Sequence, residues 1–139
     1  MPCKNPHPHF VVGEQGENCS AHFLCKLGYR ILDRNVRVGR HDEIDIIAVD
    51  PKDRVLVFVE VKSRARLDDD YVPSLNLTKE KRRNMFRAAR RWMTTHAYDG
   101  GYRLDLIGIA GSAVIEHILD VRVRDERCRP KKSWQVVPW

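Results

Sequence analysis

The stretch that most constrains the fold is "RVLVFVEVK", residues 54–62, in which an unbroken apolar run leads into Glu60 and Lys62. A run this short and this rich in β-branched residues predicts a strand that is covered on both faces. Because side chains alternate along a strand, Glu60 and Lys62 share a face with Leu56 and Phe58. The sequence therefore predicts a buried strand with a carboxylate and an ammonium at the end of an apolar face.

The preceding stretch "EIDIIAVD", residues 43–50, predicts a second strand that a short polar loop joins to the first. So short a connection predicts an antiparallel hairpin. Pairing the two residues that flank the loop and following the register places Asp45 opposite Glu60, and Glu43 opposite Lys62, on a common face. A register shifted by one residue would put Asp45 on the other face.

Two carboxylates that face each other on a largely apolar surface repel and resist ionisation. A divalent cation compensates for this, because Mg²⁺ takes one or two carboxylates together with waters and phosphate oxygens. We therefore expect Mg²⁺, or Mn²⁺, at Asp45 and Glu60. Lys62 could then orient an attacking water or stabilise developing charge on a phosphate. Glu17, on the apolar face of the first predicted helix, would add a third carboxylate, so the arrangement suits phosphodiester hydrolysis.

Each of these residues also has a simpler explanation. Glu60 and Lys62 could mark the solvated end of a strand, and Asp45 could form a diagonal ion pair with Lys62. Glu17 near a helix start is favoured by the helix macrodipole. The convergence of three acids and one lysine favours the catalytic interpretation. The predicted catalytic residues are Glu17, Asp45, Glu60 and Lys62, of which the three acids are the predicted metal ligands.

The remaining pattern predicts an α/β fold with a mixed five-stranded sheet flanked by helices, in the order helix, three strands, helix, two strands. Apolar residues recur at helical spacing over 13–27 and 79–97, and Thr78 is the expected N-cap of the second helix. One face of the first helix is predicted to hold Glu17, Ser20, Ala21, Leu24 and Leu27. The other strands are predicted over 29–36, 102–110 and 113–119.

With 139 residues the chain fits one domain, which we expect over 13–119. Residues 1–12 are predicted to be a flexible N-terminal arm, and residues 120–139 a basic C-terminal tail. No apolar run approaches the roughly 20 residues that span a bilayer, and the N-terminus lacks the apolar core of a signal peptide. We therefore expect a cytoplasmic protein with no membrane partner.

The second predicted helix is strongly basic, and the whole chain carries a formal net charge of +6. A charged outer face is normal for an amphipathic helix. Here, however, Glu80 is the only acid among many cations, and an unbalanced face favours contact with phosphates. We expect nucleic acid, DNA in particular, as the partner. The residues expected to bind it are Lys79, Lys81, Arg82, Arg83, Arg87, Arg90 and Arg91.

Asp105, in "YRLDLIGIA", has two readings that the sequence leaves open. It could support the acidic site from behind, or it could be a charge at the edge of a strand.

Five stretches resemble the YraN family of bacterial proteins. They are "GEQGENCSAHFLCKLGYRILDRNVR", "DEIDIIAVD", "VFVEVKSR", "LTKEKRRNMFRAARRW" and "YRLDLIGI", and the resemblance runs from about Gly13 to Leu119. It implies a restriction-endonuclease-like fold, similar to that of archaeal Holliday junction resolvases. Resolvases of that fold act as dimers, so the resemblance also implies a homodimer.

The family motifs match this sequence residue by residue. The matches at Glu17, Asp45 and Glu60 imply metal ligands, and the match at Lys62 implies the catalytic lysine. Lys79 and Asp105 match family positions to which we assign no role. Asp42 departs from the family, which usually has glycine there, and an extra acid could alter metal binding or repel a phosphate.

The expected function is a metal-dependent nuclease that hydrolyses DNA, with branched, junction-like DNA as a candidate substrate. The alternative is a non-catalytic module that binds nucleic acid or docks a protein on the same fold.

Overall fold

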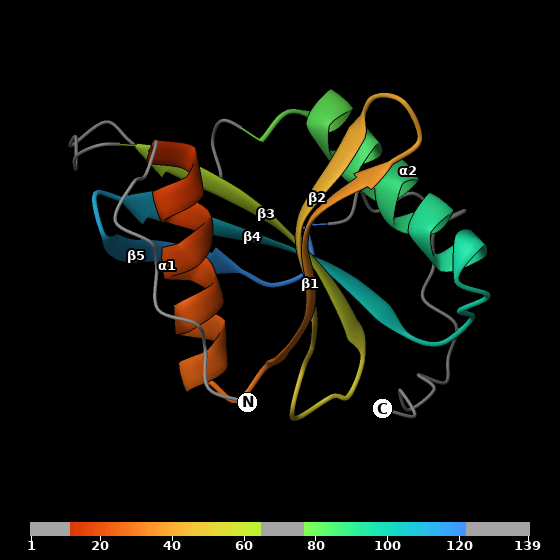
Figure 1. The fold of residues 1–139 in the computed structure, drawn as a ribbon, viewed down its shortest axis with the longest axis horizontal. Coiled ribbons are helices and arrows are strands. Elements are labelled where there is room, and N and C mark those ends of the chain that lie inside the picture. Colours follow the sequence, from red (N-terminus) through yellow and green to blue (C-terminus); the bar gives the residue numbers. More distant parts are fainter. Residues whose placement is uncertain (1–11, 65–76, 122–139) are drawn as a thin grey trace.

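The structure is a computed structural model that describes residues 12–64 and 77–121. Its helices and strands follow the predicted order of helix, three strands, helix and two strands (Figure 1). The N-terminal arm expected over 1–12 and the basic tail expected over 120–139 lie almost wholly outside the described residues. The elements are α1 Val12–Lys26, β1 Arg30–Val38, β2 Asp42–Val49, β3 Leu56–Arg64, α2 Lys79–Thr95, β4 Tyr102–Ala110 and β5 Ala113–Ile118.

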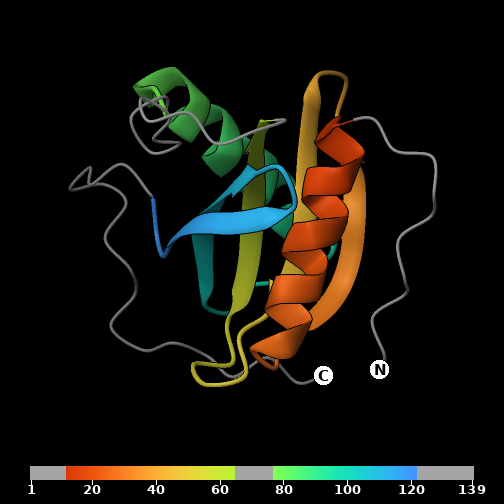
Figure 2. The same cartoon turned by 90° about the vertical axis from the view of Figure 1, so that its left-hand side faces the viewer.

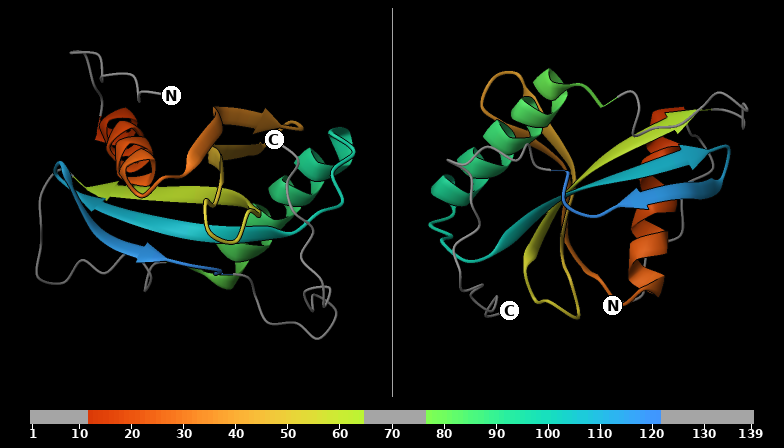
Figure 3. Two further views of the ribbon diagram at one scale, coloured as in Figure 1. Left: turned by 90° about the horizontal axis from the view of Figure 1, so that it is seen from below. Right: turned by 180° about the vertical axis from the view of Figure 1, so that it is seen from behind.

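The five strands form one sheet in the order β1-β2-β3-β4-β5. Only β3 and β4 are parallel, because α2 carries the chain over the sheet between them, so the predicted mixed sheet is confirmed. The helices cover opposite faces (Figures 2 and 3). Leu56 and Phe58 belong to the cluster on the α2 side, and Val57 and Val59 to the cluster on the α1 side. The strand covered on both faces is thus confirmed.

The hairpin of β2 and β3 has the predicted register, with Ile47 opposite Phe58. The last paired residues, however, are Ile46 and Val59. Before Ile46, β2 continues beside β1, and after Val59, β3 continues beside β4. The two strands therefore diverge from a common stem, as Figures 1 and 3 show. We call this divergence the fork.

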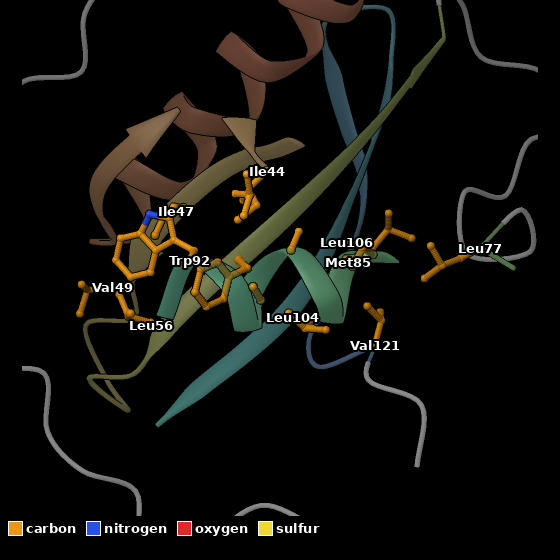
Figure 4. Packing of buried hydrophobic residues seen from close by; sticks show 14 residues of the cluster. Ile44, Ile47, Val49, Leu56, Leu77, Met85, Trp92, Leu104, Leu106 and Val121 are labelled. Atoms are coloured by element: carbon orange, nitrogen blue, oxygen red, sulfur yellow. The ribbon is translucent and has the colours of Figure 1, made fainter. Parts of the chain in front are cut away.

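The second helix begins where its N-cap was predicted, since the Thr78 hydroxyl accepts the Lys81 backbone N–H at 3.1 Å. Its apolar stripe packs onto the sheet through Met85, Ala89 and Trp92, all buried. Trp92 meets Phe58 edge to face, with ring centroids 5.7 Å apart. Figure 4 shows this cluster, which fixes the height and rotation of α2 over the strands.

The first helix buries the predicted Ser20, Ala21 and Leu24, but the prediction for Leu27 is wrong, since it is 51% exposed. The helix ends at Lys26, and Gly28 turns the chain with φ at +89°, so the helical period no longer applies to Leu27. Within the described residues, neither helix combines the length and the apolar character that crossing a bilayer demands.

Candidate active site

Asp45 lies at the fork, where its carboxylate takes over a bond of the sheet. In an antiparallel hairpin every second residue pair is hydrogen-bonded through the backbone. Here the series begins with Asp50, whose N–H donates to the Val55 carbonyl at 3.1 Å. A continued ladder would direct the Val61 N–H to the carbonyl of Ile44. Because the strands have parted, the Val61 N–H instead donates to Asp45 Oδ2 at 2.8 Å. The Asp45 side chain thus bridges the two arms of the fork.

Glu60 follows on the α2 side of the sheet, on the face that the alternation predicted. It is 9% exposed, and its Oε1 lies 2.9 Å from Lys81 Nζ and 3.8 Å from Lys62 Nζ. Burial alone would lower the pKa of Lys81, but the hydrogen bond to Glu60 and its charge outweigh burial and raise it. The α2 helix therefore contributes a firmly charged ammonium to this carboxylate.

Glu17 approaches from α1, on the opposite side of the sheet. Its side chain is partly buried, and interactions with Asn35 and Asp45 lower its pKa in part. Burial is the main reason that the pKa of Glu17 is raised above its ordinary value. The fork thus brings acids from both faces of the sheet to Asp45.

Asp45 is the acid whose ionisation is most opposed. Burial raises its pKa well above the ordinary value of 3.8, and the charges of Glu60, Glu17 and Glu43 raise it further. The bond from the Val61 N–H offsets only part of this. Asp45 therefore favours a neighbour that neutralises it, either a proton or a cation.

The donor set fits a hard divalent cation in part. In the stretches of chain that the structure describes, no three or more His, Cys, Asp or Glu side chains form a ready-made metal site. Mg²⁺ does not require one, because one or two carboxylates suffice when waters and phosphate oxygens complete its shell. A hollow of about 10 Å³, which is room for about one water, lies between Glu43, Glu60 and apolar side chains of β3 and α2.

The cations predicted to bind nucleic acid divide into two groups along α2. Lys81 turns toward the sheet and binds Glu60, and Arg82 is partly buried. The others are exposed, and Arg87 holds Asp42 through two bonds, Nε to Oδ2 at 2.9 Å and Nη2 to Oδ1 at 2.7 Å. The exposed members are Lys79, Arg83, Arg87, Arg90 and Arg91.

Asp105 lies in a separate place. It is fully buried on the α1 face, where it accepts bonds from Arg103, from His117 and from the Asp120 backbone N–H. Arg103 also donates to Asp50 at 2.9 Å. Asp105 is thus part of a buried network of charges, and neither of its two predicted roles describes it.

Two residues of the site escaped the sequence analysis. Asn35 lies between Arg34 and Val36, which pair with Ile46 and Ile44, so it stands opposite Asp45, and its side chain lowers the pKa of Glu17. An asparagine inside a strand was the available signal, since asparagine is disfavoured in strands and tolerates its φ of +51°. Lys81 was assigned to the outer surface, although a position three residues after an N-cap lies in the first turn, near the strand end that carries Glu60.

Comparison with known proteins identifies the family. Residues 16–109 match the model of "Uncharacterised protein family UPF0102". A UPF0102 protein of Pelobacter propionicus is 42% identical over 115 residues, covering 78% of this chain and 80% of the relative. One from Streptomyces coelicolor is 40% identical, covering 77% and 85%. One from Geobacter sulfurreducens is 42% identical, covering 81% and 88%. These matches confirm the resemblance to YraN-type sequences, and the chain belongs to the uncharacterised family UPF0102.

Proposed function

We propose that this protein is a metal-dependent nuclease that hydrolyses phosphodiester bonds in DNA, on a restriction-endonuclease-like fold. The observation that carries the proposal is the electrostatic coupling of Asp45 at the fork to Glu60 and Glu17, with Lys62 Nζ 3.8 Å from Glu60. Isolated strand-end charges do not require that acids from both faces of the sheet meet at one carboxylate. Branched, junction-like DNA is the substrate to test first.

The residues have distinct roles in this proposal. Asp45 and Glu60 would hold Mg²⁺ or Mn²⁺, and Glu17 would add a third oxygen donor. When bound, the cation supplies charge for a phosphate oxygen and lowers the pKa of a bound water. Lys62, whose side chain is 36% exposed and whose ammonium lies 3.8 Å from Glu60, would meet the scissile phosphate or orient the attacking water. The exposed cations of α2 would hold the backbone of the DNA.

A non-catalytic module is the second candidate, and the ion pair of Lys81 with Glu60 favours it. A carboxylate that already has a cation at 2.9 Å is satisfied without metal. In that case the fork would be a structural junction, and α2 a surface that binds nucleic acid or docks a protein. Cleavage separates the two candidates.

The test is an assay with labelled linear, flapped and four-way-junction DNA, in Mg²⁺, in Mn²⁺ and in EDTA. Asp45→Asn and Lys62→Met should each lower cleavage by about 10²–10³-fold, because the first removes a ligand of the proposed metal and the second removes the ammonium that would meet the reacting phosphate. DNA binding in EDTA should be retained. Asp33→Asn, an exposed aspartate of β1, is the matched control and should cleave normally.

Retained cleavage in both variants would sink the assignment of the site. Binding without cleavage under every metal would transfer the proposal to the non-catalytic module. The same substrates made of RNA identify the nucleic acid.

A further inference from the structure

A second charged feature lies beyond the acidic site, between α2 and the turn that joins β1 to β2. It is a hollow of about 490 Å³, within the size range of small-ligand sites. Three guanidinium groups line it, and its other walls are short side chains and backbone. We call it the arginine hollow. Its lining residues are Val38, Gly39, Arg87, Arg90, Arg91, Thr94 and Thr95.

Gly39 fixes one side of the arginine hollow. Its φ is +65°, a conformation that side chains disfavour, and a Cβ built there would collide with Nη1 of Arg91. The Arg91 guanidinium therefore lies directly on the backbone of the turn. This contact orients a cation that would otherwise move freely on the surface of α2.

Arg87 is held differently, because Asp42 binds its guanidinium with two parallel bonds. The carboxylate of Asp42 accepts both bonds from the planar guanidinium, in the geometry that a phosphate would use. The bond from Arg87 comes first among the causes that lower the pKa of Asp42, and the charges of Arg91 and His41 lower it further. In the described part of the chain, no carboxylate lies within ion-pair distance of Arg90 or Arg91. Three cations thus face one anion.

We propose that the arginine hollow binds one phosphate group of a nucleic-acid backbone, and that Asp42 competes with that phosphate for Arg87. The proposal rests on the nucleic-acid binding in the proposed function, and it does not depend on cleavage. Arg90 and Arg91 offer open donors, and Arg87 becomes a third donor only when it leaves Asp42. Asp42 thereby sets how tightly this end of α2 holds the strand.

The test compares Asp42→Asn with Asp99→Asn, which adds the same charge at an exposed position in the turn after α2. Binding of fluorescein-labelled duplex and four-way-junction DNA is followed by anisotropy in EDTA, over a series of salt concentrations. Asp42→Asn should bind about three-fold more tightly at low salt, and its slope of log affinity against log salt should be steeper by about 0.9, the value for one more phosphate contact. Asp99→Asn should stay close to the wild type.

A second set of variants tests the competition if Asp42→Asn is poorly folded. In the wild-type background, Arg87→Gln should weaken binding less than Arg91→Gln, although both are exposed arginines of one helix. In the Asp42→Asn background the two losses should become similar, and the difference is the coupling that a double-mutant cycle measures.

Equal affinity and slope for the two asparagine variants would overturn the proposal, and would leave Asp42 as a tie between β2 and α2. Equal losses for the two glutamine variants in the wild type would overturn it as well. If the protein cleaves DNA but the variants show no such differences in binding, Asp42 does not compete with phosphate and the proposed nuclease stands. If the variants show the differences but no metal supports cleavage, the competition stands and the proposed nuclease does not.

Discussion

At the scale of single residues, Asp105 shows how completely a buried charge can be satisfied. Arg103 donates to its two oxygens at 2.8 and 3.0 Å, and His117 Nε2 lies 3.0 Å from Oδ2. The remaining donors of the guanidinium go to Tyr29, Asp50 and Asp53. The network joins the end of α1, the β2–β3 turn, β4 and β5. Its energetic role is to keep Arg103 paired, because an unpaired buried charge costs far more than a pair gains.

Asp105→Asn should therefore lower the free energy of unfolding by about 3–5 kcal/mol at neutral pH, as measured by urea denaturation. Burial alone would raise the pKa of Asp105, but its bonds to His117 and Arg103 outweigh burial and hold the pKa below the ordinary 3.8. The stability that this acid contributes is thus full above pH 3.8, and it is lost as the pH falls through the lower pKa of the folded state.

The variant should consequently lose less stability than the wild type when the pH falls from about 4 to about 2, because it has no carboxylate to protonate at this position. The exposed Asp99→Asn serves as control and should follow the wild type in both experiments. Parallel stability curves for Asp105→Asn and the wild type would contradict this account.

At the scale of elements, α2 is fastened by ion pairs to two interior strands of the sheet, β3 and β2. Lys81 binds Glu60 near the start of the helix, and Arg87 binds Asp42 about 9 Å further along the axis, by the helical rise. Between them Met85 and Ala88 are buried against the strands. Both ion pairs use an acid at or near a proposed functional site, so binding of a metal or a phosphate at either site would change a contact of α2 directly.

Lys81→Met should increase the rise in melting temperature that millimolar Mg²⁺ or Mn²⁺ produces. The physical reason is that Lys81 and a metal would compete for Glu60, and a ligand that binds only the folded state stabilises it more as its affinity rises. Lys79→Met is the matched control, since Lys79 is exposed on the same first turn. A metal-induced rise that is no larger in Lys81→Met than in Lys79→Met would show that the ammonium does not compete.

The sequence predicted the elements well where local rules decide them. The period-two alternation fixed the face of Glu60, and the short loop fixed the register of Ile47 with Phe58. Thr78 marked the start of α2 because an N-cap is a local signal. The failure at Leu27 came from one residue at a helix end, where the turn at Gly28 overrides the period.

At the scale of the whole molecule, the fork could not be predicted from the hairpin. Its position depends on what lies on the outer sides of the two strands, since β1 holds one arm and β4 the other. The pairing of β3 with β4 joins residues far apart in sequence, such as Leu56 with Tyr102, and so does the bond between Arg103 and Asp50, 53 positions apart. The sequence predicted that Asp45 pairs with Glu60, but the pairing of β2 with β3 ends one step earlier, at Ile46 and Val59, and the hairpin gave no sign of that separation.

The fork itself can be tested by stability. Asp45→Ala leaves the Val61 N–H without its acceptor and should cost about 1–3 kcal/mol, offset in part by the removal of a carboxyl that resists ionisation. Asp45→Asn keeps an oxygen acceptor without the charge, and it should be at least as stable as the wild type at neutral pH. The measurement is the urea midpoint of the two variants, and a less stable Asn variant than Ala variant would refute the bridging role.

The bond from the Val61 N–H to Asp45 affects what the presence of this aspartate in related proteins can indicate. An aspartate here would meet two demands at once in the proposed nuclease, because it bonds to the Val61 N–H across the fork and would also bind the metal. A relative that is not catalytic would still lose stability if it lost this aspartate, so the presence of the aspartate in a relative is weak evidence that the relative is an enzyme. Lys62 is the better indicator of catalysis, because its partly exposed ammonium lies 3.8 Å from Glu60 and does not bridge two strands. In a family member that has lost the proposed nuclease function, Lys62 should be replaced before Asp45.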